Sequence, residues 1–414
     1  MGQDGIYKKY DKDIKFLSLS KELELQICED KKNNRISKYS FKDSDIKRRH
    51  NKEHDRQTVM RSAFDRDIEK ILYLPAYNRY NDKTQVFSFL NNDDVSRRGL
   101  HVQLVSKISR NIGSLLGLNT KLIEAIAIGH DIGHTPFGHA GEYILNNISR
   151  ERTGRYFAHN LHSVRVLDKL YKRNLSLQTL DGILCHNGEL ELKEVNCSNL
   201  SSFEELDSTI ESCYRDIKNI DHLVSATLEG CVVRFADIIA YLGKDRIDAL
   251  QIGVLDNLDK FDTNVLGRQN TTIINNLTVD LVENSYGKNK IMLSDKMFND
   301  LKTAKSQNYE FIYKPQGMMY SEELKLPIMM NKIFDKCIKD INNKEYASPI
   351  FKHHIIPLSI NSNNFSIDKY LACGIENVVI DYISSMTDTY FMMCYEKMFP
   401  NDQKIINFRG YFNI

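Results

Sequence analysis

The sequence predicts an all-α protein with few short strands. Apolar residues recur at spacings of three and four along most of the chain, whereas few windows alternate with period two. Only 7 prolines and 20 glycines interrupt these patterns over 414 residues. Hydrophobic residues make up 42% of the chain, so a sizeable core can form and global disorder is excluded.

Charge and composition exclude several classes of protein. Lysine and arginine (56) nearly balance aspartate and glutamate (55), whereas a protein that coats nucleic acid needs a clear basic excess. No apolar run fits a signal peptide or reaches the roughly 18–20 residues of a membrane helix. The eight cysteines form no C-x-x-C pair. We therefore expect a cytoplasmic protein without membrane contact and with reduced, structural thiols.

We expect three regions along the chain. Residues 1–55 are strongly polar and predict an exposed N-terminal arm that can serve as an oligomer contact. Residues 56–261 carry the strongest helical patterns and are predicted to form the catalytic core. Residues 262–414 begin with asparagine and charge and continue as helices that we expect to pack on this core. Neither an internal repeat nor a clean linker is visible.

The first two helical segments place histidines toward the core. In HVQLVSKISRNIGSLL (101–116), His101 shares a helix face with apolar residues. In LIEAIAIGHDIGHTPFGHAGE (122–142), His130 shares a face with Ile123 and Ile126 near the end of an apolar helix. Asp131 follows about 100° further round that helix.

A turn and a new helix follow the second segment. Gly133 and Pro136 predict the end of the apolar helix, which leaves His134 in a turn. His139 and Glu142 then lie three residues apart and are expected to be neighbours on the next helix.

Two later segments add further polar side chains. In FAHNLHSVRVL (157–167), His159 is expected just before another helix. In CVVRFADIIAYLGKDRIDAL (231–250), Asp237 lies on one helical stripe with Val233, Tyr241 and Asp245. An inward-facing aspartate is costly unless it is paired or binds a metal. Asp237 alone can be explained by an ion pair with an arginine of the same segment, either Arg234 or Arg246.

The combination of these residues predicts a catalytic metal site. A single inward histidine is usually a hydrogen-bonded core residue, but two histidines and two aspartates that all face inward weaken that explanation. Mixed imidazole and carboxylate ligands suit a divalent ion, and four of them leave two positions of an octahedral ion for water and a phosphoryl oxygen. We expect one ion per subunit, Mn or Mg first, with Fe, Ni or Co as alternatives. The predicted ligands are His101, His130, Asp131 and Asp237.

These residues resemble a known family. The ordered set of ligands is similar to the H…HD…D signature of the HD superfamily, and HDIGHTPFGHAGE resembles the bacterial dGTPases and related dNTP triphosphohydrolases. Flanking segments agree, including KTQVF within 61–87, FAHN, ADIIAY and DYISSMTDTY (381–390). The resemblance spans roughly residues 55–395. It implies an HD-domain helical core with additional C-terminal helices.

The resemblance also implies an activity and roles for residues. The family hydrolyses a dNTP, with dGTP as the first candidate here, to deoxynucleoside and inorganic triphosphate. His139 and Glu142 would form a catalytic pair, while His134 and His159 would contact or protonate the phosphate and the leaving oxygen. Arg98 would bind the α-phosphate. Residues that would surround the sugar are Gln85, Tyr241 and Asp245.

Alternatives remain open for the substrate contacts. Gln85 and Asp245 can also be read as surface residues, and Tyr241 as core packing beside the metal. Arg97 precedes Arg98, so the register of the phosphate contact is open. A further histidine in GILCHNG, His186, stays outside the predicted site.

Three departures from the family pattern leave base preference and effector dependence open. SRRGLHVQLV replaces a threonine–histidine–serine sequence, AYNRY replaces an arginine-rich phenylalanine motif, and Cys185 stands where relatives have a basic residue. None of these changes affects the predicted metal ligands or the catalytic pair.

Two other functions compete with the triphosphohydrolase. One is a different HD phosphohydrolase, either a nucleotidase or a phosphodiesterase. The other is a non-catalytic nucleotide sensor or a single-strand nucleic-acid binder, which the intact catalytic residues and near-neutral charge disfavour. By resemblance we expect a homo-oligomer, a tetramer or hexamer, with dNTPs as possible activators at subunit contacts.

Overall fold

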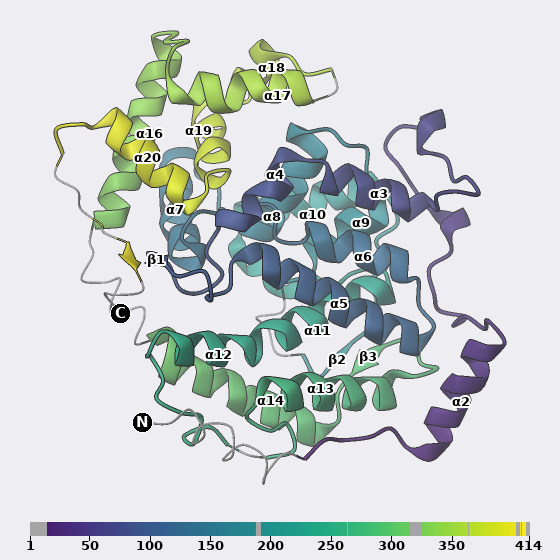
Figure 1. The fold of residues 1–414 in the computed structure, drawn as a ribbon. Helices are drawn as coiled ribbons and strands as arrows, with labels where there is room; N and C mark the ends of the chain where they lie inside the picture. The colour runs from purple at the N-terminus through teal and green to yellow at the C-terminus, as the bar shows by residue number, and fades with distance from the viewer. Residues whose placement is uncertain are drawn as a thin grey trace.

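Three mutually packed helices, α5, α6 and α11, form the centre of the computed structural model (Figure 1). Two further helices, α3 and α9, pack against α6. The structure describes residues 15–187, 192–262, 264–314, 325–362, 364–402, 406 and 408–410.

The helices fall into an N-terminal set and a C-terminal set. The first set comprises α2 (Lys21–Lys32), α3 (Ala63–Leu72), α4 (Pro75–Asn78), α5 (Arg98–Leu116), α6 (Thr120–Gly129), α7 (Gly138–Thr153), α8 (His159–Val164), α9 (Leu177–Leu184), α10 (Phe203–Arg215), α11 (Leu228–Leu242) and α12 (Lys244–Gln251). The second comprises α13 (Asn270–Ser285), α14 (Asp295–Asn308), α16 (Lys325–Asn342), α17 (Ile356–Asn361), α18 (Ile367–Leu371), α19 (Ile375–Ser384) and α20 (Asp388–Met398).

The four described strands are two residues long each. In the described part of the chain β1 (Leu90–Asn91) pairs in parallel with β4 (Arg409–Gly410), and β2 (Glu194–Val195) pairs antiparallel with β3 (Ile291–Met292). The predicted all-α class with few short strands is therefore confirmed.

Local sequence explains the sharp turn between α5 and α6. α5 ends at Leu116 and is capped by Gly117, whose φ of +68° lies in the left-handed region. A Cβ at Gly117 would lie 2.9 Å from the backbone nitrogen of Ser37. The Asn119 side chain then accepts hydrogen bonds from the backbone N–H groups of Lys121 and Leu122 and caps α6. This short connection lets α6 fold directly back onto α5.

Two expectations about helices need correction. The stripe predicted over 231–250 belongs to two helices, because α11 ends at Leu242 and α12 begins at Lys244. The break falls at Gly243, where a Cβ would lie 2.6 Å from the Cα of Asn270 at the start of α13. His159 does not precede a helix but is the first residue of α8.

The C-terminal helices form two groups that lie on different parts of the core (Figure 1). α13 packs on α5, α11 and α12, and α14 packs on α11. α16 and α19 instead pack on α7, and α20 packs on α16. The second group therefore lies against the helix that carries His139 and Glu142.

Residues 15–55 run along the core and are anchored to it. The Arg48 side chain is buried and lies 2.5 Å from Asp67 of α3, a carboxylate with no exposed surface. Arg48 also donates to the carbonyl oxygens of Ala63 and Asn174, at 2.9 and 2.7 Å. The first 14 residues of the predicted arm lie outside the described residues.

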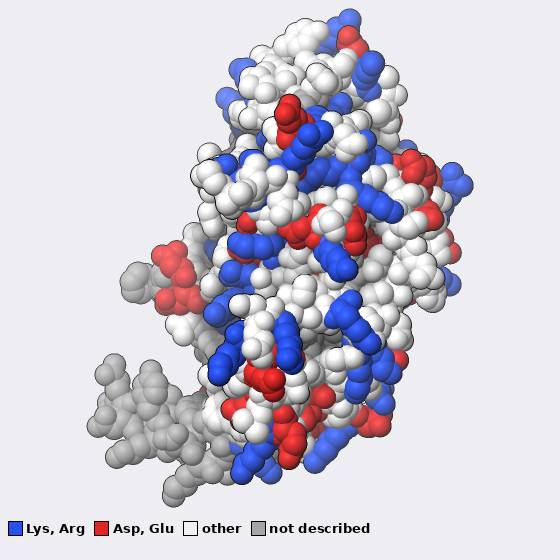
Figure 2. Space-filling model, turned by 90° about the vertical axis from the view of Figure 1, so that its right-hand side faces the viewer, with Lys and Arg blue, Asp and Glu red and all other residues white. Residues whose placement is uncertain are grey.

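The surface in Figure 2 shows lysine and arginine interspersed with aspartate and glutamate. This mixture of charges agrees with the composition, which has 56 basic and 55 acidic residues. The face drawn in Figure 2 therefore carries no large patch of a single charge sign.

Candidate functional site

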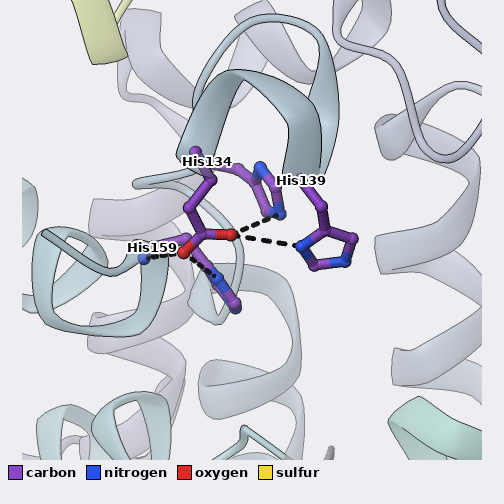
Figure 3. A group of neighbouring side chains, drawn as sticks. His134, His139 and His159 are labelled. Carbon is purple, nitrogen blue, oxygen red and sulfur yellow. Dashed lines mark hydrogen bonds and ion pairs between the residues drawn. The ribbon is translucent and has the colours of Figure 1, made fainter. Parts of the chain in front are cut away.

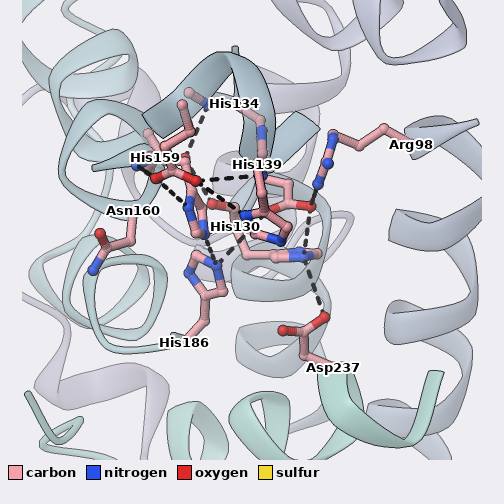
Figure 4. Close-up of polar contacts among 12 residues, drawn as sticks. Arg98, His130, His134, His139, His159, Asn160, His186 and Asp237 are labelled. Atoms are coloured by element: carbon pink, nitrogen blue, oxygen red, sulfur yellow. Dashed lines mark hydrogen bonds and ion pairs between the residues drawn. The ribbon is translucent and has the colours of Figure 1, made fainter. Parts of the chain in front are cut away.

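The predicted metal ligands meet in one buried cluster between α5, α6 and α11. Asp237 Oδ1 lies 2.9 Å from His101 Nε2 and 3.9 Å from His130 Nε2. Asp131 Oδ2 lies 3.4 Å from His130 Nε2 and 3.8 Å from His101 Nε2. Figure 4 shows His130 and Asp237 close to one another, with Arg98 beside them. The structure thus brings all four predicted ligands together.

The donor atoms fit a divalent ion. His130 Nδ1 lies 2.6 Å from the carbonyl oxygen of Ala127, which fixes the proton on Nδ1 and leaves a lone pair on Nε2. That buried Nε2 has no hydrogen-bond partner among the described residues. An unpartnered buried nitrogen is costly, and a metal ion would satisfy it. The cluster can therefore hold a metal ion.

The two carboxylates of this cluster stay ionised. Burial opposes the charge of Asp131, but its interactions with His130 and Arg98 outweigh this effect and hold the pKa of Asp131 well below its ordinary value. Burial likewise opposes the charge of Asp237, and the hydrogen bond and charge of His101 lower its pKa. Negative oxygens at these positions favour a bound cation.

Three histidines converge on Glu142 beside the metal cluster (Figure 3). Glu142 Oε2 lies 3.1 Å from His139 Nδ1 and 4.0 Å from His134 Nε2. Its other oxygen, Oε1, accepts from the backbone N–H of His159 at 2.7 Å and lies 2.8 Å from His159 Nδ1. The His134 and His159 rings are stacked with centroids 4.6 Å apart.

The four members of this group differ in exposure and charge. His139 keeps 62% of its side-chain surface exposed, whereas His134 and His159 are buried. Burial lowers the pKa of His134 well below its ordinary value, so this imidazole is neutral. Burial opposes the charge of Glu142, but His159 outweighs it and holds the pKa of Glu142 well below its ordinary value. The arrangement places one accessible imidazole on an ionised carboxylate, which suits proton transfer at a bound substrate.

Comparisons with known proteins agree with this site. The family model of the HD domain matches residues 98–242, the stretch that holds every predicted metal ligand. A deoxyguanosinetriphosphate triphosphohydrolase-like protein of Desulfatibacillum aliphaticivorans is 32% identical over 349 residues, which is 82% of this chain and 88% of that protein. Similarly named proteins of Clostridium tetani (31% identical, covering 83% and 88%) and Caldanaerobacter subterraneus (28%, covering 93% and 96%) also match.

The chain belongs to this family of triphosphohydrolase-like HD-domain proteins. Membership makes the coarse class of the protein a hydrolase of the HD type.

In this protein, the neighbouring residues Arg98 and Arg97 have different hydrogen-bond partners. The Arg98 guanidinium donates through Nη1 to Asp131 and through Nη2 to the Thr84 carbonyl oxygen at 3.1 Å, and its side chain is buried. Arg97 points elsewhere and donates to the Leu90 carbonyl oxygen at 2.8 Å. Of these two arginines, Arg98 is the one with a described contact to the ligand cluster, and its contact with the α-phosphate stays a prediction.

Asp245 is not a surface residue, since only 2% of it is exposed. Its Oδ2 accepts a hydrogen bond from the Tyr313 hydroxyl at 2.6 Å. Burial raises the pKa of Asp245 to about 7. Tyr241 lies half-buried at the edge of the same core. Asp245 and Tyr313 thus form a hydrogen-bonded polar pair, and the sugar contacts of Asp245 and Tyr241 stay a prediction.

Gln85 is also not simply exposed. Its side-chain Oε1 is buried and lacks a hydrogen-bond partner among the described residues. Its backbone carbonyl oxygen lies 3.4 Å from Arg98 Nη2. The unpartnered buried side-chain oxygen of Gln85 is available to a ligand hydroxyl.

Sequence reasoning missed three residues at this site. His186 was set aside, yet its Nε2 lies 3.2 Å from His159 Nε2 and 3.6 Å from Asp131 Oδ1. Lys83 is buried and donates to the carbonyl oxygens of His134 and, at 2.8 Å, Ser384. Tyr313, bonded to Asp245, is the third. The sequence held a signal for the first two of these residues. His186 follows an apolar helix within GILCHNG, and Lys83 is the first residue of KTQVF.

A search of the described helices finds no segment that is both long and apolar enough to span a membrane.

Proposed function

We propose that this protein is a metal-dependent dNTP triphosphohydrolase that releases deoxynucleoside and inorganic triphosphate, with dGTP as the first substrate to test. The observation that carries the proposal is the adjacency of two groups. Asp131 of the ligand cluster and His159 of the Glu142 group lie 3.9 Å apart, from Oδ1 to Nε2. The names of the relatives support the triphosphohydrolase reaction and the guanine base.

A divalent ion in the cluster would polarise a phosphoryl oxygen and lower the pKa of a bound water. Arg98 supplies a buried guanidinium next to that position, which suits an α-phosphate oxygen. His139, held by Glu142 and exposed, is placed to exchange a proton with the attacking water or the leaving oxygen. The ring of His134 is neutral, and its two nitrogens have no hydrogen-bond partner among the described residues, so it can contact the phosphate chain.

The sugar side of the proposal rests on Gln85, Tyr241 and Asp245. A protonated Asp245 hydroxyl or its carboxylate oxygen can pair with a sugar hydroxyl, and Tyr241 gives a flat wall. The base of a bound nucleotide would lie beyond these residues. Their contacts therefore support a deoxynucleotide substrate in general more directly than they support a particular base.

The test is product analysis. Purified protein is incubated with each dNTP, singly and as a mixture of four, with Mn or Mg, and products are resolved by ion-exchange chromatography. We expect deoxynucleoside and intact triphosphate, with activity abolished in Asp131→Ala and Glu142→Ala. Glu204→Ala, which removes an exposed acid from the first turn of α10, is the matched control and should retain full activity.

Each other product pattern points to a competing function. Release of single phosphate would indicate a nucleotidase of the HD type, and hydrolysis of a phosphodiester without dNTP turnover would indicate an HD phosphodiesterase. Binding of nucleotide without turnover in all mixtures would indicate a sensor. The homo-oligomer remains part of the proposal, and sedimentation as a monomer at every concentration would contradict it.

A further inference from the structure

Four of the eight cysteines interact with one another where α9 packs on α10 and α11 (Figure 1). Cys185 follows α9, Cys197 lies between β2 and α10, Cys213 is in α10, and Cys231 is in the first turn of α11. Cys231 interacts with Cys197 and Cys185, and Cys185 interacts with Cys213. All four are free thiols. Buried cysteines usually pack as small apolar side chains, and the buried residues Cys185 and Cys213 fit that description.

Cys197 and Cys231 differ from it because their thiols contact one another through a hydrogen bond. The backbone explains this contact. The carbonyl oxygen of Ser225 accepts a hydrogen bond at 3.0 Å from the N–H of Ser198, the residue after Cys197. Cys231 Sγ lies 3.9 Å from the same oxygen. The segment of Cys197 and the thiol of Cys231 therefore meet at one backbone atom.

The two thiols differ in access and in charge. Cys197 is half-buried, whereas only 1% of Cys231 is exposed. The hydrogen bond from Cys231 lowers the pKa of the Cys197 thiol below its ordinary value. The same hydrogen bond, together with burial, raises the pKa of the Cys231 thiol well above its ordinary value. Because the thiolate is the reactive form of cysteine, Cys197 is the nucleophile of the pair and Cys231 holds its proton.

A buried cation lies beside this pair. Arg234 follows Cys231 by three residues in α11, and its side chain is buried. Its Nη1 donates to the carbonyl oxygen of Leu223 at 2.7 Å, whereas its buried Nη2 has no hydrogen-bond partner among the described residues. The guanidinium interacts with Cys185 and Cys231. A positive charge next to a cysteine pair stabilises the thiolate that oxidation requires.

We propose that Cys197 and Cys231 are a modification site that forms a reversible intramolecular disulfide when the protein meets a hydroperoxide. The Cys197 thiolate attacks the peroxide, whose O–O bond breaks, and Cys197 becomes a sulfenic acid while hydroxide or alkoxide leaves and takes up a proton. The Cys231 sulfur then attacks the Cys197 sulfur, the S–S bond forms, and the sulfenic oxygen leaves as water with the Cys231 proton. The two thiols lose two electrons, and the hydroperoxide is reduced to water or an alcohol. A small dithiol reverses the bond by exchange.

The disulfide would join the segment between β2 and α10 to α11, the helix that also carries Asp237. The inference goes beyond the proposed function and does not depend on it. Neither cysteine belongs to the metal cluster or to the group around Glu142, so failure of one proposal leaves the other standing.

The test is a map of the thiols in the full-length protein. Reduced and desalted protein is treated with equimolar hydrogen peroxide, the remaining thiols are alkylated with N-ethylmaleimide in denaturant, and peptides from trypsin and Glu-C are identified by mass spectrometry. The second protease is needed because the tryptic peptide 194–215 contains both Cys197 and Cys213. Glu-C separates them, since glutamates lie between the two cysteines at Glu204, Glu205 and Glu211.

We expect loss of the free Cys197 thiol and a peptide that links Cys197 to Cys231 in the oxidised wild-type protein, and dithiothreitol should remove the link. Cys197→Ser should not form the link. Cys231→Ser should instead keep a sulfenic acid at Cys197, which dimedone labels. The matched control is Cys373→Ser, which removes an exposed thiol and should form the link as the wild type does. If Cys231→Ser fails to fold, the wild-type map still decides.

Two results would overturn the proposal. One is alkylation of both Cys197 and Cys231 after peroxide treatment, which would show that their contact is only packing. The other is a link from either residue to a different cysteine, such as Cys185 or Cys213, in place of the link between them.

Discussion

The carboxylate of Asp388, in the first turn of α20, accepts a hydrogen bond from the backbone N–H of Phe137 at 2.9 Å. Phe137 has a φ of +63°, a left-handed conformation that is uncommon for a bulky residue. It lies between His134 and His139, in the turn that positions both histidines. The other oxygen of Asp388 accepts from the backbone N–H of Thr84 at 3.2 Å and from its hydroxyl. Asp388 of α20 thus holds the turn between His134 and His139 in a strained conformation.

Asp388→Ala is expected to destabilise the protein and to slow turnover. It would leave two buried backbone N–H groups, those of Phe137 and Thr84, without acceptors, at a cost of about 1–3 kcal/mol each. We expect a decrease of several degrees in Tm and a larger loss in kcat than in KM, because the turn carries His134 and precedes His139. Thermal melting and steady-state kinetics measure both.

Asp388→Asn keeps one acceptor oxygen, so its Tm and its kcat should lie between those of the wild type and the alanine variant. Asp368→Ala removes an exposed acid from the first turn of α18 and is the control for helix-end charge. Equal melting temperatures for Asp388→Ala and the wild type would show that the hydrogen bonds of Asp388 do not hold the turn.

Glu142→Gln is expected to lower kcat by roughly 10²–10⁴, the range typical for loss of a general acid–base function. The amide cannot carry the negative charge that holds both His139 Nδ1 and His159 Nδ1, at 3.1 and 2.8 Å. Turnover at saturating dNTP is the measurement. Glu151→Gln changes an exposed glutamate of the same helix and should behave as wild type; comparable activity in both variants would remove Glu142 from the mechanism.

The metal cluster could be predicted from sequence because its ligands lie on or at the ends of regular helices. His101 on α5 and Asp237 on α11 share faces with buried apolar residues, so helical periodicity alone directs them inward. His130 ends the apolar helix α6, and the turn after it followed from Gly133 and Pro136. Periodicity failed at Gly243, where the approach of Asn270 breaks the helix and no local pattern reports that approach.

The residues that were missed depend on contacts between distant segments. Lys83 bonds to partners 51 and 301 positions away, and Tyr313 meets Asp245 across 68 positions. A lysine in a polar segment is usually solvated, and only the fold reveals that Lys83 is buried with its pKa lowered by burial to about 7. His186 shares its local context with His130, but its neighbours His159 and Asp131 become visible only in three dimensions.

Arg48→Ala is expected to destabilise the fold strongly although Arg48 lies in the polar N-terminal segment. Removal of one partner of a buried ion pair typically costs about 3–5 kcal/mol, because the other charge stays buried. Among the described residues, Asp67 would keep the hydrogen bonds from the Ser176 N–H and the Thr179 hydroxyl, at 3.0 and 2.9 Å. A urea titration should show a lower midpoint, whereas Arg35→Ala, at an exposed ion pair, should change it little. Equal midpoints would show that residues 15–55 are not anchored through Arg48.

Asp245 makes stability depend on pH in a defined direction. Burial raises its pKa to about 7 in the folded protein, whereas the pKa of an aspartate in the unfolded chain is about 3.9. The folded state therefore binds the proton more tightly. The contribution of Asp245 to stability is complete below the unfolded pKa and is lost as the pH rises through about 7.

Asp245→Asn should therefore gain stability over the wild type as the pH rises, because asparagine stays neutral while its carbonyl oxygen can still accept from the Tyr313 hydroxyl. The measurement is the difference in Tm between variant and wild type, in nucleotide-free protein, at several values from acid to mildly alkaline pH. This difference should grow most through neutral pH, where the buried carboxyl ionises. Asp256→Asn, at an exposed position, controls for the loss of one negative charge. A difference that stays constant with pH would mean that Asp245 is ionised throughout and is stabilised by groups other than Tyr313.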